Sequence, residues 1–268
     1  AEQAVRGCVE RLIAGPVNGC GWGILALGKL GAGELNFSSD IDLIMLHDSQ
    51  HPKHDDTYFI DLTRNLSRLL SRQTSDGFGW RVDLRLRPDM GGGAVSLGIN
   101  SALTYYETNA RSWERAAFIR ARPIAGDLAL GRKFLADIAP FIWRRSVDFT
   151  IIDDLHPWLK HQPIPNELFG IDVKKGAFCI RHIELLVHTI QLLKGGRHPE
   201  LRIGDTIGAL RQCAESGWIS TDKADMLSQN YLAWRRIEHR LQYQKDTQTY
   251  TLPRNEEEFT KFAGFMGF

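Results

Sequence analysis

Apolar residues in this chain follow two periodicities, and together they predict an ordered series of strands and helices. Short apolar or alternating runs predict strands over residues 22–28, 40–47 and 80–87. Apolar side chains three or four residues apart predict helices over residues 2–14 and 57–73. The later pattern is helical and predicts helices over residues 101–122, 127–148, 177–194, 204–216 and 221–244.

The order of these elements, strands first and helices second, is typical of an α+β protein. We expect a small domain with a mixed sheet over residues 1–126 and an all-helical bundle domain over residues 127–268. A chain of 268 residues is long enough for two modest domains.

The most informative segment covers residues 23–46, where a glycine-rich turn joins two apolar runs. In a strand alternate side chains share a face, so Ser38, Asp40 and Asp42 are expected to point the same way. Two carboxylates about 7 Å apart on one face repel each other unless a cation lies between them. Mg²⁺, completed by substrate phosphates, fits that requirement, and Mn²⁺ is an alternative. The segment predicts a metal-dependent phosphoryl or nucleotidyl transfer site.

The strand expected over residues 80–87 adds a third acid to this site. Its alternation places Asp83, Arg85 and Arg87 on one face. Together with Asp40 and Asp42, Asp83 provides enough carboxylates for two Mg²⁺ ions. The two arginines are suited to bidentate binding of phosphate oxygens. The alternative is a solvent-facing sheet whose polar residues merely mark its exposed side.

The turn over residues 28–33 supplies a further phosphate-binding candidate. Because glycine lets a ligand approach the backbone closely, N–H groups in this turn are expected to cradle a phosphate.

The net charge, the apolar stretches and the cysteines limit the classes of protein to which this chain can belong. A net charge of +1 without a long basic run argues against general affinity for nucleic acid or anionic membranes. No apolar stretch reaches membrane-spanning length, and no signal peptide is expected. The four cysteines are scattered, which favours a reducing, cytoplasmic location. The chain begins without methionine, so we expect it to be a piece of a longer protein.

Residues 28–44, GKLGAGELNFSSDIDLI, resemble the signature of the glutamine synthetase adenylyltransferase/adenylyl-removing enzymes. These enzymes belong to the polymerase-beta-like nucleotidyltransferase superfamily. The similarity continues through residues 81–88, 111–115, 180–184 and 195–197 and covers nearly the whole chain. The resemblance implies a nucleotidyltransferase catalytic domain followed by a helical domain.

The family enzyme has two nucleotidyltransferase halves, one attaching AMP to a tyrosine of glutamine synthetase and one removing it. The Asn-Phe-Ser-Ser form of residues 36–39 is similar to the removing half. The resemblance therefore implies Mg²⁺-dependent phosphorolytic removal of AMP, with release of ADP. Implied partners are glutamine synthetase, orthophosphate, ADP or ATP and, through the full-length enzyme, the PII signalling protein. The alternatives are an ATP-dependent adenylyltransferase and a non-catalytic module that binds nucleotide or a partner protein.

Site residues follow from the same resemblance. Asp40, Asp42 and Asp83 are expected to be catalytic and to bind metal. Arg115 and Arg122, seven residues apart, are expected to share a helix face, contacting either nucleotide or a structural ion-pair partner. The residues expected to bind nucleotide or phosphate are Gly28, Lys29, Gly31, Ser38, Ser39, Arg85, Arg87, Arg115, Arg122, Arg181 and Glu184.

One segment departs from the family pattern. Phe178 and Cys179 stand where the family usually has two glycines, and His182 replaces an acid. Arg181 and Glu184 still fall on one helix stripe, which either reaches the active cleft or is a solvated or structural face. These departures motivate the alternative of a regulatory module.

Overall fold

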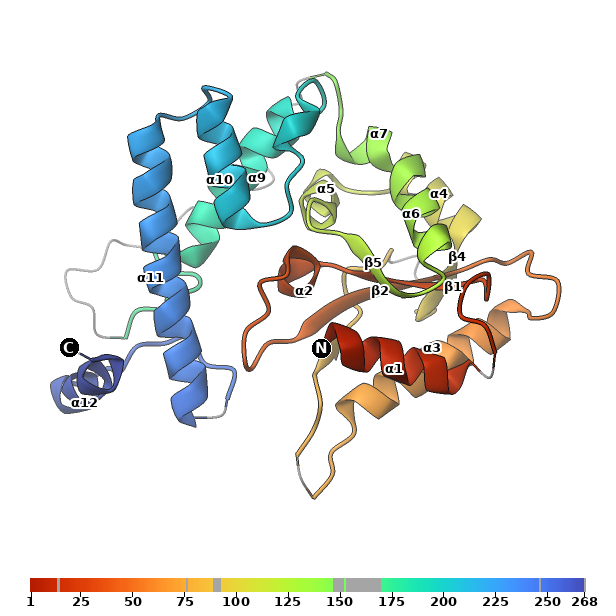
Figure 1. Cartoon of the computed structure of the whole chain (residues 1–268), viewed down its shortest axis with the longest axis horizontal. Helices are drawn as coiled ribbons and strands as arrows, with labels where there is room; N and C mark the ends of the chain where they lie inside the picture. The colour runs from red at the N-terminus through yellow and green to blue at the C-terminus, as the bar shows by residue number, and fades with distance from the viewer. Residues whose placement is uncertain are drawn as a thin grey trace. The chain divides into compact units, whose positions relative to one another are not determined.

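A computed structural model describes residues 1–13, 15–75, 77–88, 93–146, 152, 170–245 and 247–267. It divides into two compact units: Ala1–Leu35 with Ser39–Arg144, and Asn36–Ser38 with Arg145–Phe268. The described elements of the first unit are α1 (Glu2–Leu12), β1 (Trp22–Ala26), α2 (Gly28–Ala32), β2 (Ile41–His47), α3 (Asp56–Ser71), β3 (Val82–Asp83), β4 (Ser96–Gly98), α4 (Ile99–Thr108), α5 (Ser112–Phe118), β5 (Arg122–Gly126), α6 (Leu128–Asp137) and α7 (Ala139–Ile142) (Figure 1). Those of the second unit are α9 (Ile180–Lys194), the 3₁₀ helix η2 (Pro199–Leu201), α10 (Thr206–Glu215), α11 (Thr221–Lys245) and α12 (Glu256–Met266).

The first unit is built on a five-stranded mixed sheet with the order β3-β2-β1-β5, in which β4 also pairs with β2. β1 is antiparallel to both β2 and β5. β3 and β4 run parallel to β2, β3 pairing with its beginning and β4 with its end. The expected combination of a small mixed sheet and many helices is therefore confirmed.

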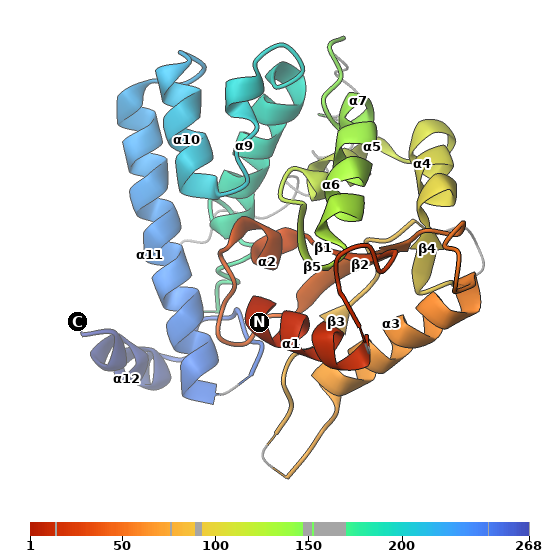
Figure 2. The same cartoon turned by 45° about the vertical axis from the view of Figure 1, so that its right-hand side comes forward.

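Helices cover both faces of this sheet (Figures 1 and 2). Ile24 and Leu43 belong to a core packed by α1 and α3. Leu25 and Ile44 belong to a second core on the opposite face, with side chains from α4, α5, α6 and α7. Because both faces are covered, β1 and β2 have nearly continuous apolar sequences. The predicted strands over residues 22–28 and 40–47 are confirmed as Trp22–Ala26 and Ile41–His47, whereas Gly28 instead begins α2.

Three predicted elements differ from the structure. The strand expected over residues 80–87 is reduced to Val82–Asp83. The helix expected over residues 101–122 is divided into α4 and α5, and its last residue instead begins β5. The helix expected over residues 127–148 is divided into α6 and α7, and its last two residues lie outside the described part. The local sequence pattern does not predict β5, because its extended backbone depends on antiparallel pairing with β1.

The described part of the second unit is mainly helical. Ile183 of α9, Leu210 of α10 and Tyr231 of α11 form a common core. A separate core joins Leu241 to Phe262 of α12, a helix absent from the sequence prediction. None of the described helices is both long and apolar enough to cross a membrane.

The first unit extends through Arg144, beyond the domain boundary expected at residue 126. The physical reason is that α6 packs against β1 and β5, while Phe134 and Ile142 join the core over that face.

Candidate functional site

Asp42 and Asp83 lie side by side on neighbouring strands. β2 and β3 are parallel, and their register pairs Asp42 directly with Asp83. Neighbouring strands are about 4.8 Å apart, so paired residues on one face are adjacent. Ile41 and Val82, one residue earlier on each strand, pack into the core under α1 and α3. Backbone register therefore brings two of the three predicted acids together.

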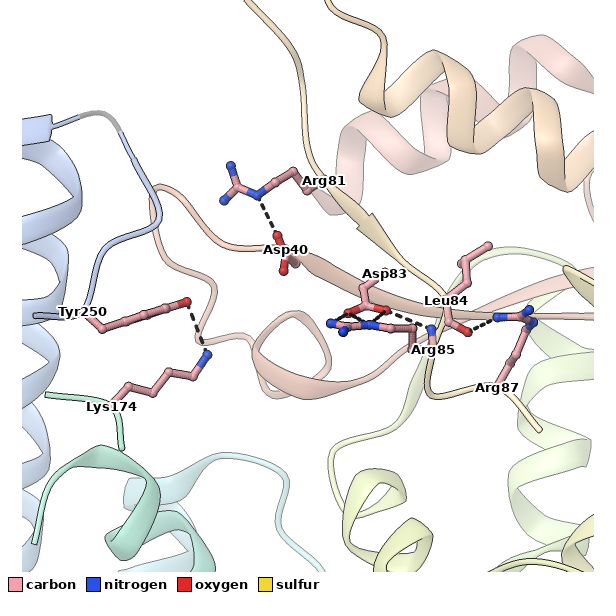
Figure 3. A network of polar contacts seen from close by, with 8 residues as sticks. All are labelled: Asp40, Arg81, Asp83, Leu84, Arg85, Arg87, Lys174 and Tyr250. Atoms are coloured by element: carbon pink, nitrogen blue, oxygen red, sulfur yellow. Dashed lines mark hydrogen bonds and ion pairs between the residues drawn. The ribbon is translucent and has the colours of Figure 1, made fainter. Parts of the chain in front are cut away.

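The third acid, Asp40, lies just before β2 and is bound by an arginine. Its Oδ1 accepts a hydrogen bond of 2.7 Å from Arg81 Nε (Figure 3). The backbone N–H of Ile41 donates to the carbonyl of Arg81 at 2.9 Å, where pairing of β2 with β3 begins. The Arg81 guanidinium therefore compensates the charge of Asp40 in this structure.

Arg85 binds Asp83 through both carboxylate oxygens. Arg85 Nε lies 3.0 Å from Oδ1 and 2.9 Å from Oδ2, and Nη2 lies 2.5 Å from Oδ2 (Figure 3). The hydrogen bond from Arg85 lowers the pKa of Asp83. The pKa of Arg85 is raised first by Asp83, with further contributions from the charges of Asp40 and Asp42. All three carboxylates therefore act on one guanidinium, whose side chain is 85% exposed.

The donor chemistry of this group suits Mg²⁺ or Mn²⁺, because hard divalent cations prefer carboxylate oxygens. Within the described part of the chain, no three His, Cys, Asp or Glu side chains meet closely enough to hold a metal ion. The cations present are Arg81 at Asp40 and Arg85 at Asp83. These two guanidinium groups bind carboxylate oxygens that a divalent ion would need as ligands.

The predicted strand over residues 80–87 is wrong beyond Asp83, so Arg85 and Arg87 lie in a turn. The Arg85 backbone N–H donates to Asp83 Oδ1 at 2.8 Å, a contact that turns the chain. Arg87 Nη1 donates to the Leu84 carbonyl at 2.7 Å, and its Nε donates to the Ala94 carbonyl at 2.9 Å. Arg87 thus stabilises the turn through these two hydrogen bonds. It forms no ion pair with a carboxylate of the described residues.

The segment expected to be a phosphate-cradling turn, residues 28–33, forms the short helix α2. The N–H groups of Gly31 and Gly33 donate to carbonyls of this same region at 2.8 and 3.1 Å, so they do not form an open cradle. Gly28 has a φ of +51°, and a Cβ there would lie 2.3 Å from Asp42 Oδ2. Glycine at this position lets the Asp42 carboxylate pack against the backbone.

Arg115 and Arg122 do not share a helix face, because Arg115 lies in α5 and Arg122 begins β5. Arg122 Nε donates to the Gly31 carbonyl at 2.8 Å, and its Nη2 lies 2.7 Å from Glu2 Oε2. Arg115 is 1% exposed, and its Nε donates to the Ile142 carbonyl at 3.1 Å. In this structure Arg122 holds the end of α2, and Arg115 joins α5 to α7.

Three further residues expected to bind nucleotide or phosphate lie in or near α2 and β2, namely Lys29, Gly31 and Ser39. Lys29 is buried within α2. A Cβ on Gly31 would lie 2.1 Å from the Arg120 carbonyl oxygen and 2.7 Å from that of Ala26. Ser39 is half-buried in the segment that leads into β2.

Residues Asn36–Ser38 belong to the second unit, where they contact α11. Arg235 Nη2 donates to Asn36 Oδ1 at 2.5 Å, and His239 Nε2 lies 3.1 Å from the same oxygen. The Ser38 backbone N–H donates to Gln242 Oε1 at 3.2 Å. Ser38 lies in a turn and β2 begins only at Ile41, so Ser38 is not part of the strand on which the alternation placed it.

The segment that departs from the family pattern contains an unusual backbone conformation. Phe178 has a φ of +57°, in the left-handed region, and its side chain is exposed. Its N–H donates to His182 Nδ1 at 2.6 Å. Glycine adopts this region without steric cost, whereas phenylalanine adopts it only with strain. Arg181 and Glu184 lie nearby in α9, and Glu184 Oε1 accepts from the Tyr231 hydroxyl at 3.4 Å.

Phe178→Gly is expected to stabilise the second unit slightly. Left-handed backbone costs a non-glycine residue about 1–2 kcal/mol, and the added freedom of glycine in the unfolded chain offsets about 0.5–1 kcal/mol. Urea unfolding should show the gain, and Phe178→Ala, which keeps the strain, should not. A Phe178→Gly variant less stable than Phe178→Ala would contradict this explanation.

A pocket of about 620 Å³ adjoins the carboxylates within the first unit. It is lined by Arg85, Arg87, Tyr105, Asn109, Arg111, Trp113 and Glu114, and is called here the arginine–tryptophan pocket. Sequence reasoning identified Arg85 and Arg87 but not the other five lining residues as site residues. The available signal was the resemblance over residues 111–115, which by itself does not show that these side chains line a pocket with the two arginines.

Comparison with known families matches both parts of the chain. Residues 1–137 match the family described as glutamate-ammonia ligase adenylyltransferase. Residues 159–268 match the family described as GlnD PII-uridylyltransferase.

Curated relatives give the same result over nearly the whole chain. A bifunctional glutamine synthetase adenylyltransferase/adenylyl-removing enzyme of Xanthobacter autotrophicus is 45% identical over 95% of this chain and 27% of its own length. The protein of the same name from Brucella melitensis is 44% identical over 94% of this chain and 27% of its own. That of Bradyrhizobium sp. strain BTAi1 is 44% identical over all of this chain and 28% of its own.

The chain thus spans about a quarter of the length of these relatives. The match to the first family covers residues 1–137, about half of this chain. The chain belongs to the glutamate-ammonia ligase adenylyltransferase family.

Proposed function

We propose that this chain removes AMP from the adenylylated tyrosine of glutamine synthetase by phosphorolysis. The observation that carries the proposal is the paired register of Asp42 and Asp83, with Asp40 acting on the same exposed cation. The names of the relatives support nucleotidyl transfer on glutamine synthetase. The Asn-Phe-Ser-Ser form of residues 36–39 favours removal over attachment.

The proposed reaction transfers an adenylyl group between two oxygens. An orthophosphate oxygen forms a bond to the phosphorus of tyrosyl-AMP, and the bond from that phosphorus to the tyrosine oxygen breaks. The tyrosine oxygen takes up a proton, and the products are ADP and the free hydroxyl. Such transfers depend mainly on in-line positioning and on stabilisation of charge at the phosphoryl oxygens.

The residues of the site have distinct proposed roles. Asp40, Asp42 and Asp83 are the ligands for Mg²⁺ or Mn²⁺, which when bound supplies positive charge beside the phosphoryl oxygens. Arg85 and Arg87 bind phosphate oxygens through their guanidinium groups. Gly28 has no side chain and therefore leaves the space that the Asp42 carboxylate occupies.

The remaining assignments rest on the same family relationship. We propose that the first unit is the nucleotidyltransferase domain and that the described helices of the second form part of an all-helical bundle. We propose the PII protein as a partner that acts through a full-length enzyme, since this chain spans about a quarter of the length of its relatives.

The test is to incubate the chain with adenylylated glutamine synthetase, Mg²⁺ and orthophosphate, and to measure ADP. Phosphate-dependent ADP that disappears in an Asp40→Asn/Asp42→Asn variant is the expected result. AMP transfer from ATP to unmodified glutamine synthetase, without ADP release from the adenylylated form, would favour the adenylyltransferase instead. A folded chain that catalyses neither reaction would exclude both enzymatic functions for the isolated chain.

Arg85→Gln is expected to tighten Mn²⁺ binding, because it removes the cation that occupies both oxygens of Asp83. The expected gain is several-fold, about tenfold at most, because an exposed ion pair contributes little free energy. Titration followed by Mn²⁺ electron paramagnetic resonance measures this without turnover. Arg64→Gln on α3, where Arg64 pairs with Asp61, is the matched control and should bind Mn²⁺ like the unmodified chain. Equal or weaker binding by Arg85→Gln would show that Arg85 does not compete for the metal site.

A further inference from the structure

The arginine–tryptophan pocket carries an excess of positive charge. Arg85 is paired with Asp83, whereas Arg87 donates to the backbone carbonyls of Ala94 and Leu84. Within the described residues, the Arg111 guanidinium takes part in no ion pair, and its side chain is exposed. Among the lining residues that the structure describes, one carboxylate, that of Glu114, lies against these cations. The charge balance favours an anionic ligand.

The Glu114 carboxylate is already hydrogen-bonded within the protein. Its Oε1 accepts from the Tyr105 hydroxyl at 3.0 Å and from the Arg111 backbone N–H at 2.9 Å. Glu114 is 4% exposed. These bonds hold the Tyr105 ring and the beginning of α5 in position, so the wall carrying Arg111 and Trp113 is preorganised.

The same lining offers an aromatic surface beside the cations. Trp113 is 38% exposed at the pocket, which leaves part of its indole ring available for stacking. The Asn109 side chain adds an amide with both a donor and an acceptor. A flat aromatic group, an amide and several guanidinium groups together match a ligand with an aromatic base and a phosphate. The volume, about 620 Å³, lies in the range of small-molecule sites.

We infer that this pocket binds the adenosine 5′-phosphate part of the substrate and product, with the base on Trp113 and the phosphates at Arg85, Arg87 and Arg111. The inference rests on the proposed function for the identity of the base. Arg85 connects the two sites, since it lines the pocket and binds Asp83. A ligand phosphate at Arg85 therefore lies next to the acids proposed to act on it.

The experiment is isothermal titration of ADP, adenosine and orthophosphate into the whole chain in EDTA, so that added metal plays no part. Trp113→Ala is expected to weaken ADP and adenosine binding about tenfold, and Trp113→Phe to restore most of it. Arg111→Gln is expected to weaken ADP binding about tenfold while leaving adenosine nearly unchanged. The matched controls are Trp218→Ala and Arg64→Gln, at exposed positions outside the pocket, which should bind all three ligands normally.

Several outcomes overturn the inference. They are no ADP binding by the unmodified chain, equal ADP binding by Trp113→Ala, an equal loss in Trp218→Ala, or binding of orthophosphate with no contribution from adenosine. ADP binding that depends on Trp113, without ADP release from adenylylated glutamine synthetase, would support the pocket and refute the proposed function. ADP release with an unchanged KM in Trp113→Ala would support the function and refute the pocket.

Discussion

Asp42→Asn is expected to lower the rate of ADP release by at least about 10²–10³-fold, the range seen when one group that stabilises a transition state is lost. Asparagine keeps the shape that packs against Gly28 but removes the negative charge beside Asp83. Binding of Mn²⁺ should weaken in parallel, because the variant loses a proposed carboxylate ligand. The measurements are single-turnover ADP release and Mn²⁺ titration.

Thermal unfolding separates this effect from loss of the fold. Removing one of two adjacent carboxylates relieves repulsion, so the melting temperature should not fall. Asp61→Asn is the matched control, since the Asp61 side chain is 59% exposed on α3, where it pairs with Arg64. It should keep both activity and stability, because exposed ion pairs contribute little. An Asp42→Asn variant with more than a tenth of the original rate would refute the catalytic role.

Gly31→Ala is expected to destabilise the first unit by about 3 kcal/mol, the upper part of the range for overpacking. The added Cβ would lie 2.1 Å from the Arg120 carbonyl oxygen and 2.7 Å from that of Ala26. Both obstacles are backbone atoms, so α2 must move as a unit. Movement of α2 also displaces Gly28 from Asp42, and activity should fall with stability.

Gly7→Ala is the matched control for this prediction. Gly7 lies within α1, and nothing lies within 4 Å of its added Cβ. Alanine there should raise stability by about 0.5–1 kcal/mol through helix propensity. Urea unfolding of both variants measures the contrast. A Gly31→Ala variant as stable as the original chain would show that α2 is free to shift.

The sequence pattern within a single segment was sufficient to predict the elements whose apolar residues repeat with a clear period. The apolar runs of β1 and β2 and the helical stripe of α3 were predicted because burial imposes a period on each segment. Asp42 and Asp83 were identified from the alternation on their strands and from the signature around them. Those residues specify the chemistry of the site before any folding is considered.

Tertiary structure decided everything that depends on a partner distant in the sequence. β3 is a strand only over the two residues that pair with β2, and β5 is a strand because β1 pairs with it. Register places Asp42 opposite Asp83, and packing brings Arg111 and Trp113 to the pocket of Arg85. Periodicity records which side of an element is buried, whereas register, ion pairs and cavities arise only when separate elements meet.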